Sequence, residues 1–73
     1  MSKLYTIYKG NSNFKFGKGV RVAEITDDDR IIDVSYGSDI TEWLNWSDVE
    51  YYEDYTTEYE QEAFILAQEL NEK

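Results

Sequence analysis

The chain has 73 residues and is acidic, with 16 Asp and Glu residues against seven Lys and Arg and a net charge of −9. It contains no Cys and no His, which excludes disulfides, thiolate metal sites and the commonest general base. This length allows one domain, residues 1–73, in which two Trp, seven Tyr and three Phe must supply much of the buried surface.

The charge is divided unevenly along the chain. Residues 1–23 carry five cations and no acid, a charge of +5, whereas residues 24–73 carry all 16 acids against Arg30 and Lys73, a charge of −14. Such an asymmetry indicates an electrostatic role. No apolar run approaches the roughly 20 residues that span a bilayer, and the first ten residues lack the apolar segment of a signal peptide. We therefore expect a cytoplasmic protein without a membrane partner.

Two strands are predicted in the first third of the chain. Residues 3–9 are rich in β-branched and aromatic side chains and are followed by a Gly-Asn-Ser-Asn turn. Residues 20–26 form the second strand, in which the adjacent apolar residues Val22 and Ala23 break the alternation of polar and apolar side chains. This break favours burial on both faces of the sheet, or a bulge.

Between these strands, residues 14–19 (FKFGKG) interleave two Phe with two Lys. We interpret them as a short strand and turn whose Phe rings enter the core. The alternative is a loop that stacks on bases and contacts phosphates, which would make residues 9–21 a single-stranded nucleic-acid site.

A third strand is predicted over residues 30–36, after a hairpin tip formed by the three Asp residues 27–29. Alternation predicts one apolar face, made by Ile32, Val34 and Tyr36. Asp33 is then on the opposite, mostly polar face. The carboxylates of the tip lack the Gly and the distal Glu of an EF-hand loop, so we expect a solvated turn and no metal site.

A short helix is predicted through Asn45, with Ser38 or Asp39 as its N-cap. Its apolar face is expected to contain Ile40, Trp43 and Leu44. We expect Trp43 and Trp46 to lie in the core or at its edge.

The next segment, residues 47–54, has an ambiguous pattern. It is compatible with the start of a helix after a Ser cap, but we favour an edge strand or an irregular segment in which Val49 and Tyr51 point inward.

The C-terminal helix is predicted from a capping box, with Thr57 as the N-cap and Glu60 as the acidic partner, to Lys73. The face expected on the sheet contains Tyr59, Ala63, Leu66, Ala67 and Leu70. A neighbouring face gathers Glu58, Glu62, Glu69 and Glu72 around Ile65. We expect an aromatic ring to cover Ile65; alternatively, Ile65 is the apolar centre of a contact surface. The elements together predict an α+β domain: a small antiparallel sheet of three or four strands with the C-terminal helix packed on one face.

The most acidic stretch runs from Asp48 to Glu62, with seven carboxylates, four tyrosines and no Lys or Arg. Such acidity weakens folding by like-charge repulsion, which a basic partner relieves, although a solvated face without a partner is the simpler alternative. Its charge density is comparable to that of DNA, which has one charge per about 3.4 Å of each strand. We predict a contact surface for the basic cleft of a nucleic-acid-binding protein, formed by Asp48, Glu50, Tyr51, Tyr52, Glu53, Asp54, Tyr55, Glu58, Glu62 and Glu69.

In size, in its pI near 4.2 and in this stretch of acids and tyrosines, the chain resembles the small acidic inhibitors that phages and mobile elements encode against restriction enzymes, CRISPR effectors, uracil-DNA glycosylase or RNA polymerase. Many of these inhibitors mimic DNA, so the resemblance implies a non-enzymatic inhibitor that does not itself bind nucleic acid. No nucleophile is paired with a base at a recognisable spacing, and we expect no catalysis, no cofactor and no metal. The main alternative is an assembly module in which the basic segment of one copy meets the acidic segment of another, giving a homodimer or a larger oligomer.

Overall fold

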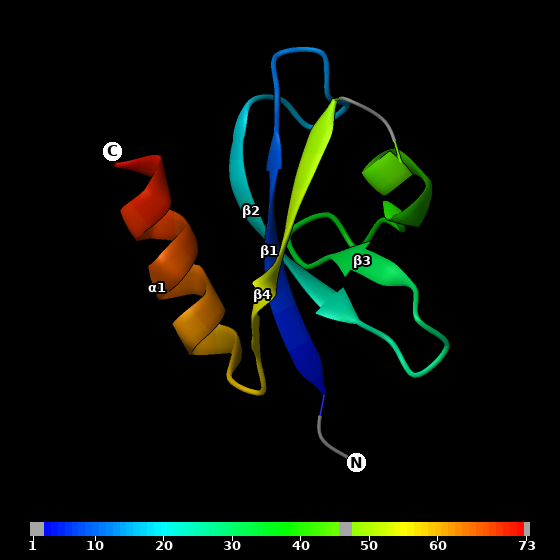
Figure 1. Cartoon of the computed structure of the whole chain (residues 1–73), viewed down its shortest axis with the longest axis vertical. Coiled ribbons are helices and arrows are strands. Elements are labelled where there is room, and N and C mark those ends of the chain that lie inside the picture. Colours follow the sequence, from blue (N-terminus) through cyan, green and yellow to red (C-terminus); the bar gives the residue numbers. More distant parts are fainter. Residues whose placement is uncertain (1–2, 46–47, 73) are drawn as a thin grey trace.

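The computed structural model describes residues 3–45 and 48–72 (Figure 1). Its elements, in chain order, are β1 (Leu4–Gly10), β2 (Gly19–Ile25), β3 (Ile31–Asp33), the 3₁₀ helix η1 (Thr41–Asn45), β4 (Val49–Thr57) and α1 (Glu60–Asn71). The α+β prediction is confirmed, with four strands and one C-terminal α-helix.

The strands form one sheet in the order β3-β2-β1-β4, and every neighbouring pair is antiparallel. β1, β2 and β3 follow one another as hairpins, and the chain then returns so that β4 pairs with the free side of β1. Figure 1 shows α1 on one side of the sheet and η1 on the other. β4 is therefore an edge strand, and β1 lies in the middle of the sheet.

Each face of the sheet has its own hydrophobic core. On the α1 side, Ile7 and Val22 pack against Ala63 and Ala67 of the helix. On the η1 side, Ala23 belongs to a more aromatic cluster with the residues Tyr8, Phe14, Ile31, Ile40 and Val49. Val22 and Ala23 are thus buried on opposite faces, as the broken alternation of this strand predicted.

The prediction for the third strand is wrong in its length and in its faces. β3 ends at Asp33, and this carboxylate is completely buried, while Tyr36 is 56% exposed. The hydroxyl of Tyr8 donates to Asp33 Oδ2, and the backbone N–H of Tyr36 donates to Asp33 Oδ1 at 2.9 Å. A buried carboxylate is stable when such donors satisfy it, so Asp33 ends the strand and holds the turn that follows.

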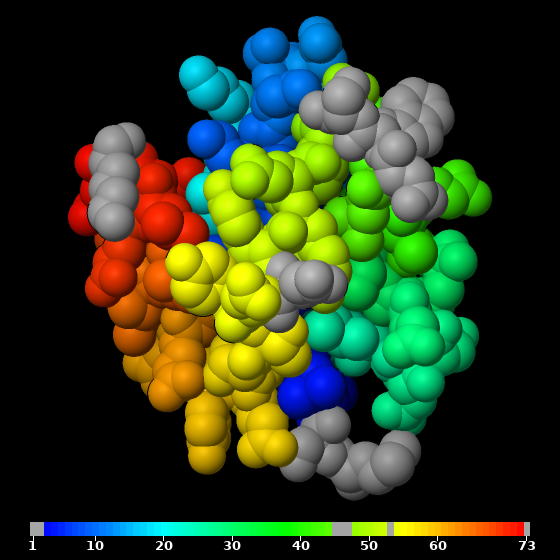
Figure 2. All heavy atoms as spheres, viewed as in Figure 1, coloured from blue at the N-terminus to red at the C-terminus, as the bar shows by residue number. Residues whose placement is uncertain are grey.

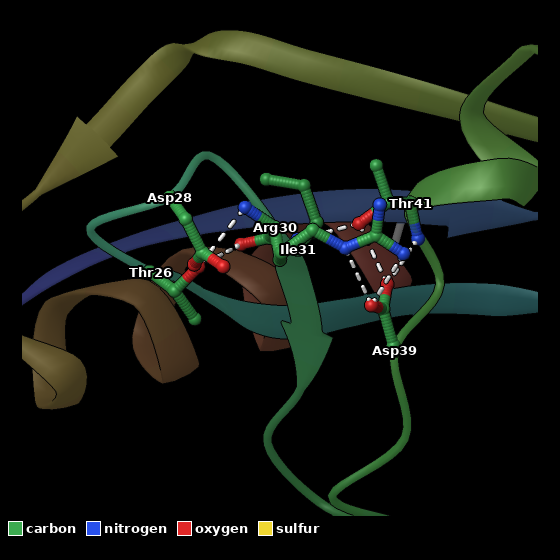
Figure 3. A network of polar contacts seen from close by, with 6 residues as sticks. All are labelled: Thr26, Asp28, Arg30, Ile31, Asp39 and Thr41. Atoms are coloured by element: carbon green, nitrogen blue, oxygen red, sulfur yellow. Dashed lines mark hydrogen bonds and ion pairs between the residues drawn. The ribbon is translucent and has the colours of Figure 1, made fainter.

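The hairpin tip before β3 is a solvated turn, as predicted. Asp29 adopts a left-handed conformation with φ of 62°, and its N–H donates to the carbonyl of Thr26. The Thr26 hydroxyl donates to Asp28 at 2.6 Å, and this hydrogen bond lowers the pKa of the Asp28 carboxyl (Figure 3). The hairpin is held by local side-chain contacts that need no ion.

The short helix is confirmed as η1. Of the two N-cap candidates, Ser38 and Asp39, the structure shows Asp39 in this role. Asp39 Oδ1 accepts hydrogen bonds from the N–H and the hydroxyl of Thr41, and Arg30 pairs with Asp39 Oδ2 at 2.6 Å (Figure 3). The bonds from Thr41, followed by that from Arg30, lower the pKa of Asp39. Ile40 is buried, and Trp43 packs beside it in the η1-side core. Trp46 lies outside the described residues.

The segment between β1 and β2 forms turns, without the short strand that we predicted. Phe14 is 4% exposed and stands edge-on to Tyr8 and Trp43, with ring centroids 5.6 and 5.4 Å away. Its ring lies against Gly10, where a Cβ would approach it to 2.4 Å. The Phe ring therefore enters the core, as we interpreted it, and it requires glycine at the end of β1.

The helix begins later than predicted, because β4 continues through Thr57, which pairs with Tyr5. The Thr57 hydroxyl accepts from the N–H of Tyr59 and donates to Glu62, so the predicted capping box does not form. Tyr59 is 63% exposed and does not lie on the sheet, contrary to the prediction. The rest of that face is confirmed: Ala63 and Ala67 are buried, and Leu66 and Leu70 are half-buried against the α1-side core.

The far end of α1 is fixed to β2 by one side chain. The Asn71 amide accepts from the N–H of Val20 at 2.8 Å and donates to its carbonyl at 3.0 Å. β3 pairs only with residues 23–25 of β2 and does not reach Val20. The Asn71 side chain therefore takes the place of a neighbouring strand at Val20. Within residues 3–45 and 48–72, no helix is long and apolar enough to cross a membrane.

Candidate functional site

The acidic stretch from Asp48 to Glu62 is divided between an edge strand, a connection and the start of α1. β4 faces the viewer in Figures 1 and 2, with α1 beside it. The prediction of an edge strand is confirmed: Val49 is buried and Tyr51 half-buried in the η1-side core. The strand is longer than residues 47–54, since it continues to Thr57.

Strand alternation separates the tyrosines that the sequence brings together. Tyr51 pairs with Tyr8 and packs on the η1 side, whereas Tyr52 pairs with Ile7 and packs on the α1 side. The ring of Tyr52 contacts that of Tyr55 edge-on, with centroids 5.9 Å apart. Burial, followed by the nearby Glu50 carboxylate, raises the pKa of Tyr52. Tyr51 and Tyr52 are thus half-buried on opposite faces, and the exposed tyrosines of the acidic stretch are Tyr55 and Tyr59.

An irregular bulge interrupts β4 in the middle of the acidic stretch. Tyr52 pairs with Ile7 and Thr57 with Tyr5, so residues 53–56 of β4 stand opposite the single residue Thr6. The Thr6 hydroxyl donates to the carbonyl of Tyr52 at 3.2 Å, beside the bulge. Asp54 and Tyr55 are exposed there, Tyr55 by 43%; the side chain of Glu53 lies outside the described part. Bulges at sheet edges redirect side chains and prevent further strand pairing.

The α1 flank beside β4 extends the acidic surface. At about 100° per residue, Glu62 and Glu69 lie roughly 180° and 160° around the helix from Asn71. Since Asn71 binds β2, these two carboxylates are on the opposite flank, toward β4. The hydrogen bond between Thr57 and Glu62, 3.0 Å long, agrees with this placement.

Ile65 is exposed, so the expectation that an aromatic ring covers it is wrong. It is 51% exposed and lines a shallow hollow of about 490 Å³ together with Tyr5, Tyr59 and the connection before α1. Glu58 and Glu62 line the same hollow. An exposed apolar side chain between carboxylates is the arrangement that we gave as the alternative.

The first part of the surface has a basic neighbour that the sequence did not reveal. Glu50 pairs in register with Lys9 of β1, and both line a small hollow with Asp48. The carbonyl of Asp48 also accepts from the N–H of Asn11. Lys9 lies about 40 residues away in the sequence, and only the pairing of β1 with β4 brings it here. The surface around Asp48 and Glu50 is therefore less negative than the sequence of the acidic stretch suggests.

We use the name acid–tyrosine edge for eight residues of this surface, of which the first and third are half-buried and the others exposed: Asp48, Glu50, Tyr52, Asp54, Tyr55, Glu58, Glu62 and Glu69. Residues 48–72 hold nine carboxylates and no Lys or Arg. The ion pairs among the described residues are Lys3 with Glu24 and Arg30 with Asp39, and neither involves this edge. Glu62 accepts a hydrogen bond from the Thr57 hydroxyl, and the carboxylates of the edge have no ion pair among the described residues.

In the described part of the chain, no three carboxylates are grouped as a metal site. No protein-family model matches the chain, and no curated protein or solved structure matches it either.

Proposed function

We propose that this protein is a non-enzymatic inhibitor that occupies the basic nucleic-acid-binding cleft of another protein through its acid–tyrosine edge. The observation that carries the proposal is the structural isolation of the charge. The carboxylates of the edge extend along β4 and the adjacent flank of α1, and no ion pair among the described residues neutralises them.

The geometry of the edge supports a mimic of a charged backbone. Side chains on one side of a regular strand repeat at roughly 6.6 Å, about twice the spacing of phosphates along one DNA strand. The bulge at residues 53–56 interrupts this repeat on β4, so the edge resembles a nucleic acid in its charge density and not in its spacing. A second row of acids, Glu62 and Glu69, follows the axis of α1 beside the strand. Two rows of negative charge along this edge complement a groove lined with Lys and Arg, and long-range attraction accelerates the encounter.

The tyrosines supply the contact area that charge alone lacks. Tyr52 and Tyr55 form a ring pair beside the bulge, and the 43% exposure of Tyr55 makes it available to a partner. Tyrosine is enriched at the energetic centres of interfaces because it combines an apolar ring with a hydroxyl. We expect these rings to form the centre of the contact and the carboxylates to form its rim.

Structural reasons account for only part of this acidity. Charges and a bulge on an edge strand prevent pairing with other chains, and this explains some of the acids on β4. Glu60 and Glu62 lie in the first turn of α1, where the helix dipole favours them. Glu58 directly precedes the N-cap Tyr59 and shares the favourable dipole, whereas Glu69 lies in the last turns of α1, where neither reason applies.

The test is competition with duplex DNA for a panel of DNA-binding enzymes that includes a restriction enzyme, a CRISPR effector, uracil-DNA glycosylase and RNA polymerase. We expect displacement of DNA from at least one enzyme, weaker at higher salt. The double variant Glu50→Gln/Glu58→Gln should lose about tenfold in affinity, or about 1.4 kcal/mol.

The matched control is Glu60→Gln/Glu72→Gln, which removes the same charge at positions outside the acid–tyrosine edge and should keep the affinity. Equal losses of affinity in both double variants would show that binding depends on the net charge of the chain and not on the acid–tyrosine edge. Binding that is absent from the whole panel, or indifferent to salt, would refute the proposal.

A further inference from the structure

A second surface carries the opposite charge on the β2–β3 side of the sheet. The rings of Phe16 and Tyr36 are stacked, with centroids 4.2 Å apart and planes at 10°. The Arg21 guanidinium lies 5.2 Å from the centroid of Tyr36 and 5.9 Å from that of Phe16, and Lys15 Nζ lies 5.2 Å from Phe16. We call these four residues the cation–aromatic surface.

The fold holds this surface in place without neutralising it. Arg21 donates to the carbonyl of Phe16, and the buried Asp33 fixes the backbone N–H of Tyr36. Arg21 Nε is buried without a hydrogen-bond partner in the part of the chain that the structure describes. Neither Lys15 nor Arg21 is among the ion pairs found there. Neither cation is paired with a carboxylate of the described residues; Lys15 is exposed, and Arg21 is half-buried with its Nε closed to solvent.

The two charged surfaces are on opposite sides of the sheet order. Arg21 belongs to β2, Tyr36 follows β3, and Lys15 and Phe16 precede β2, whereas the acid–tyrosine edge is built on β4. In the order β3-β2-β1-β4, the central strand β1 separates β2 from β4. One molecule can therefore present both surfaces at once without any rearrangement.

We propose that the cation–aromatic surface binds the acid–tyrosine edge of a second copy of this chain, so that copies associate head to tail. The edge offers its carboxylates to the two cations of this surface, Lys15 and Arg21. The long-range repulsion between two chains of charge −9 is screened beyond about 8 Å at physiological salt. Local complementarity then decides the contact.

A nucleic acid fits this surface less well. Phe14, the other ring of the same loop, is buried in the core and cannot stack on a base. The ring of Phe16 is stacked on Tyr36 and has Lys15 over it. The ring of Tyr36 is in turn contacted by Phe16 and by Arg21. The surface thus offers cations more than open ring faces, which disfavours stacked bases.

Head-to-tail contact has a consequence that distinguishes it from a symmetric dimer. Because each copy uses two different surfaces, the association continues to longer oligomers unless a ring closes. The same contact covers the edge that the proposed function requires, so association and inhibition exclude each other. The inference itself does not rest on the proposed function, since it needs only the two surfaces.

The experiment is sedimentation velocity over a range of protein concentrations at roughly 0.1 M and roughly 1 M salt, where the Debye length falls from about 10 to about 3 Å. We expect oligomers that dissociate at the higher salt. Lys15→Glu should abolish them, whereas Lys3→Glu, a matched reversal at the exposed residue paired with Glu24, should leave them. A monomer under all conditions, or association unchanged by Lys15→Glu, overturns the inference.

Mixing two blocked variants tests the head-to-tail geometry directly. Lys15→Glu retains the acid–tyrosine edge, and Glu50→Gln/Glu58→Gln retains the cation–aromatic surface without creating a basic edge that could attract the glutamate introduced at position 15. Each alone should be monomeric, and the mixture should form a 1:1 dimer and nothing larger. Absence of that dimer contradicts the pairing of these two surfaces.

Oligonucleotide binding by the unmodified chain that Lys15→Glu removes would assign the surface to nucleic acid and overturn the inference, whatever the outcome for the inhibitor proposal.

Discussion

The acids of the β2–β3 side and those of the acid–tyrosine edge have the same chemistry but different surroundings. Asp28 accepts from Thr26, Asp39 from Thr41 and Arg30, and the buried Asp33 from Tyr8 and from backbone. On the edge, the hydrogen bond between Thr57 and Glu62 is an exception, and the charges mostly face outward. The comparison teaches that acids near β3 are held by donors of the fold, whereas among the described residues those of the edge have few such donors.

The largest expected effect comes from removing the buried acid. Asp33→Ala leaves the Tyr8 hydroxyl and the N–H of Tyr36 without their acceptor, and should lower the free energy of unfolding by about 3 kcal/mol. In the unmodified chain, burial and the hydrogen bond to Asp33 raise the pKa of Tyr8. In Asp33→Ala the hydroxyl of Tyr8 is a buried donor without this acceptor. Urea denaturation measures the loss.

The matched control for this change is Asp54→Ala, which removes an exposed acid from the bulge of β4. It should change the free energy of unfolding by less than about 0.5 kcal/mol. Equal losses in the two variants would remove the distinction between the two groups of acids.

A smaller effect is expected from the exposed acids of the β2–β3 side, and it depends on pH. The pKa values of Asp28 and Asp39 are lowered in the folded protein. Their stabilisation is therefore complete above the unfolded pKa, about 3.9, and is lost as the pH falls through the folded values. Asp28→Asn/Asp39→Asn should be less stable than the unmodified chain at neutral pH, and the difference should shrink below about pH 4.

Urea unfolding of both proteins at neutral pH and at about pH 3 tests this dependence. A difference in stability that does not change with pH would show that the carboxylate charge is not involved. In that case the hydrogen bonds to Thr26 and Thr41 act as neutral contacts.

Local patterns were sufficient for much of the fold. β-Branched and aromatic residues predicted β1, the broken alternation of Val22 and Ala23 predicted burial on both faces, and the carboxylate of Asp39 predicted the start of η1. Each of these signals depends on residues that are close together in the sequence, where spacing determines geometry.

Contacts between distant residues explain the errors. Asp33 is buried because its hydroxyl donor, Tyr8, lies 25 residues away, and no local pattern predicts a buried carboxylate. The capping box at Thr57 was overridden by the pairing of that residue with Tyr5. The same kind of contact brings Lys9 to Glu50. The acidic stretch was recognisable from composition. Which of its side chains lie on each face of β4 depends on the pairing of β4 with β1, which the sequence alone does not reveal.

The central claim is that the acids of the acid–tyrosine edge are not needed for the fold, and it can be tested without knowing the partner. The measurement is the free energy of unfolding of Glu50→Gln/Glu58→Gln in urea at neutral pH and low salt. Because like charges along the edge repel one another, the variant should be as stable as the unmodified chain or more stable by up to about 0.5 kcal/mol. A loss of more than about 1 kcal/mol would show that these carboxylates stabilise the folded chain, and would contradict the account.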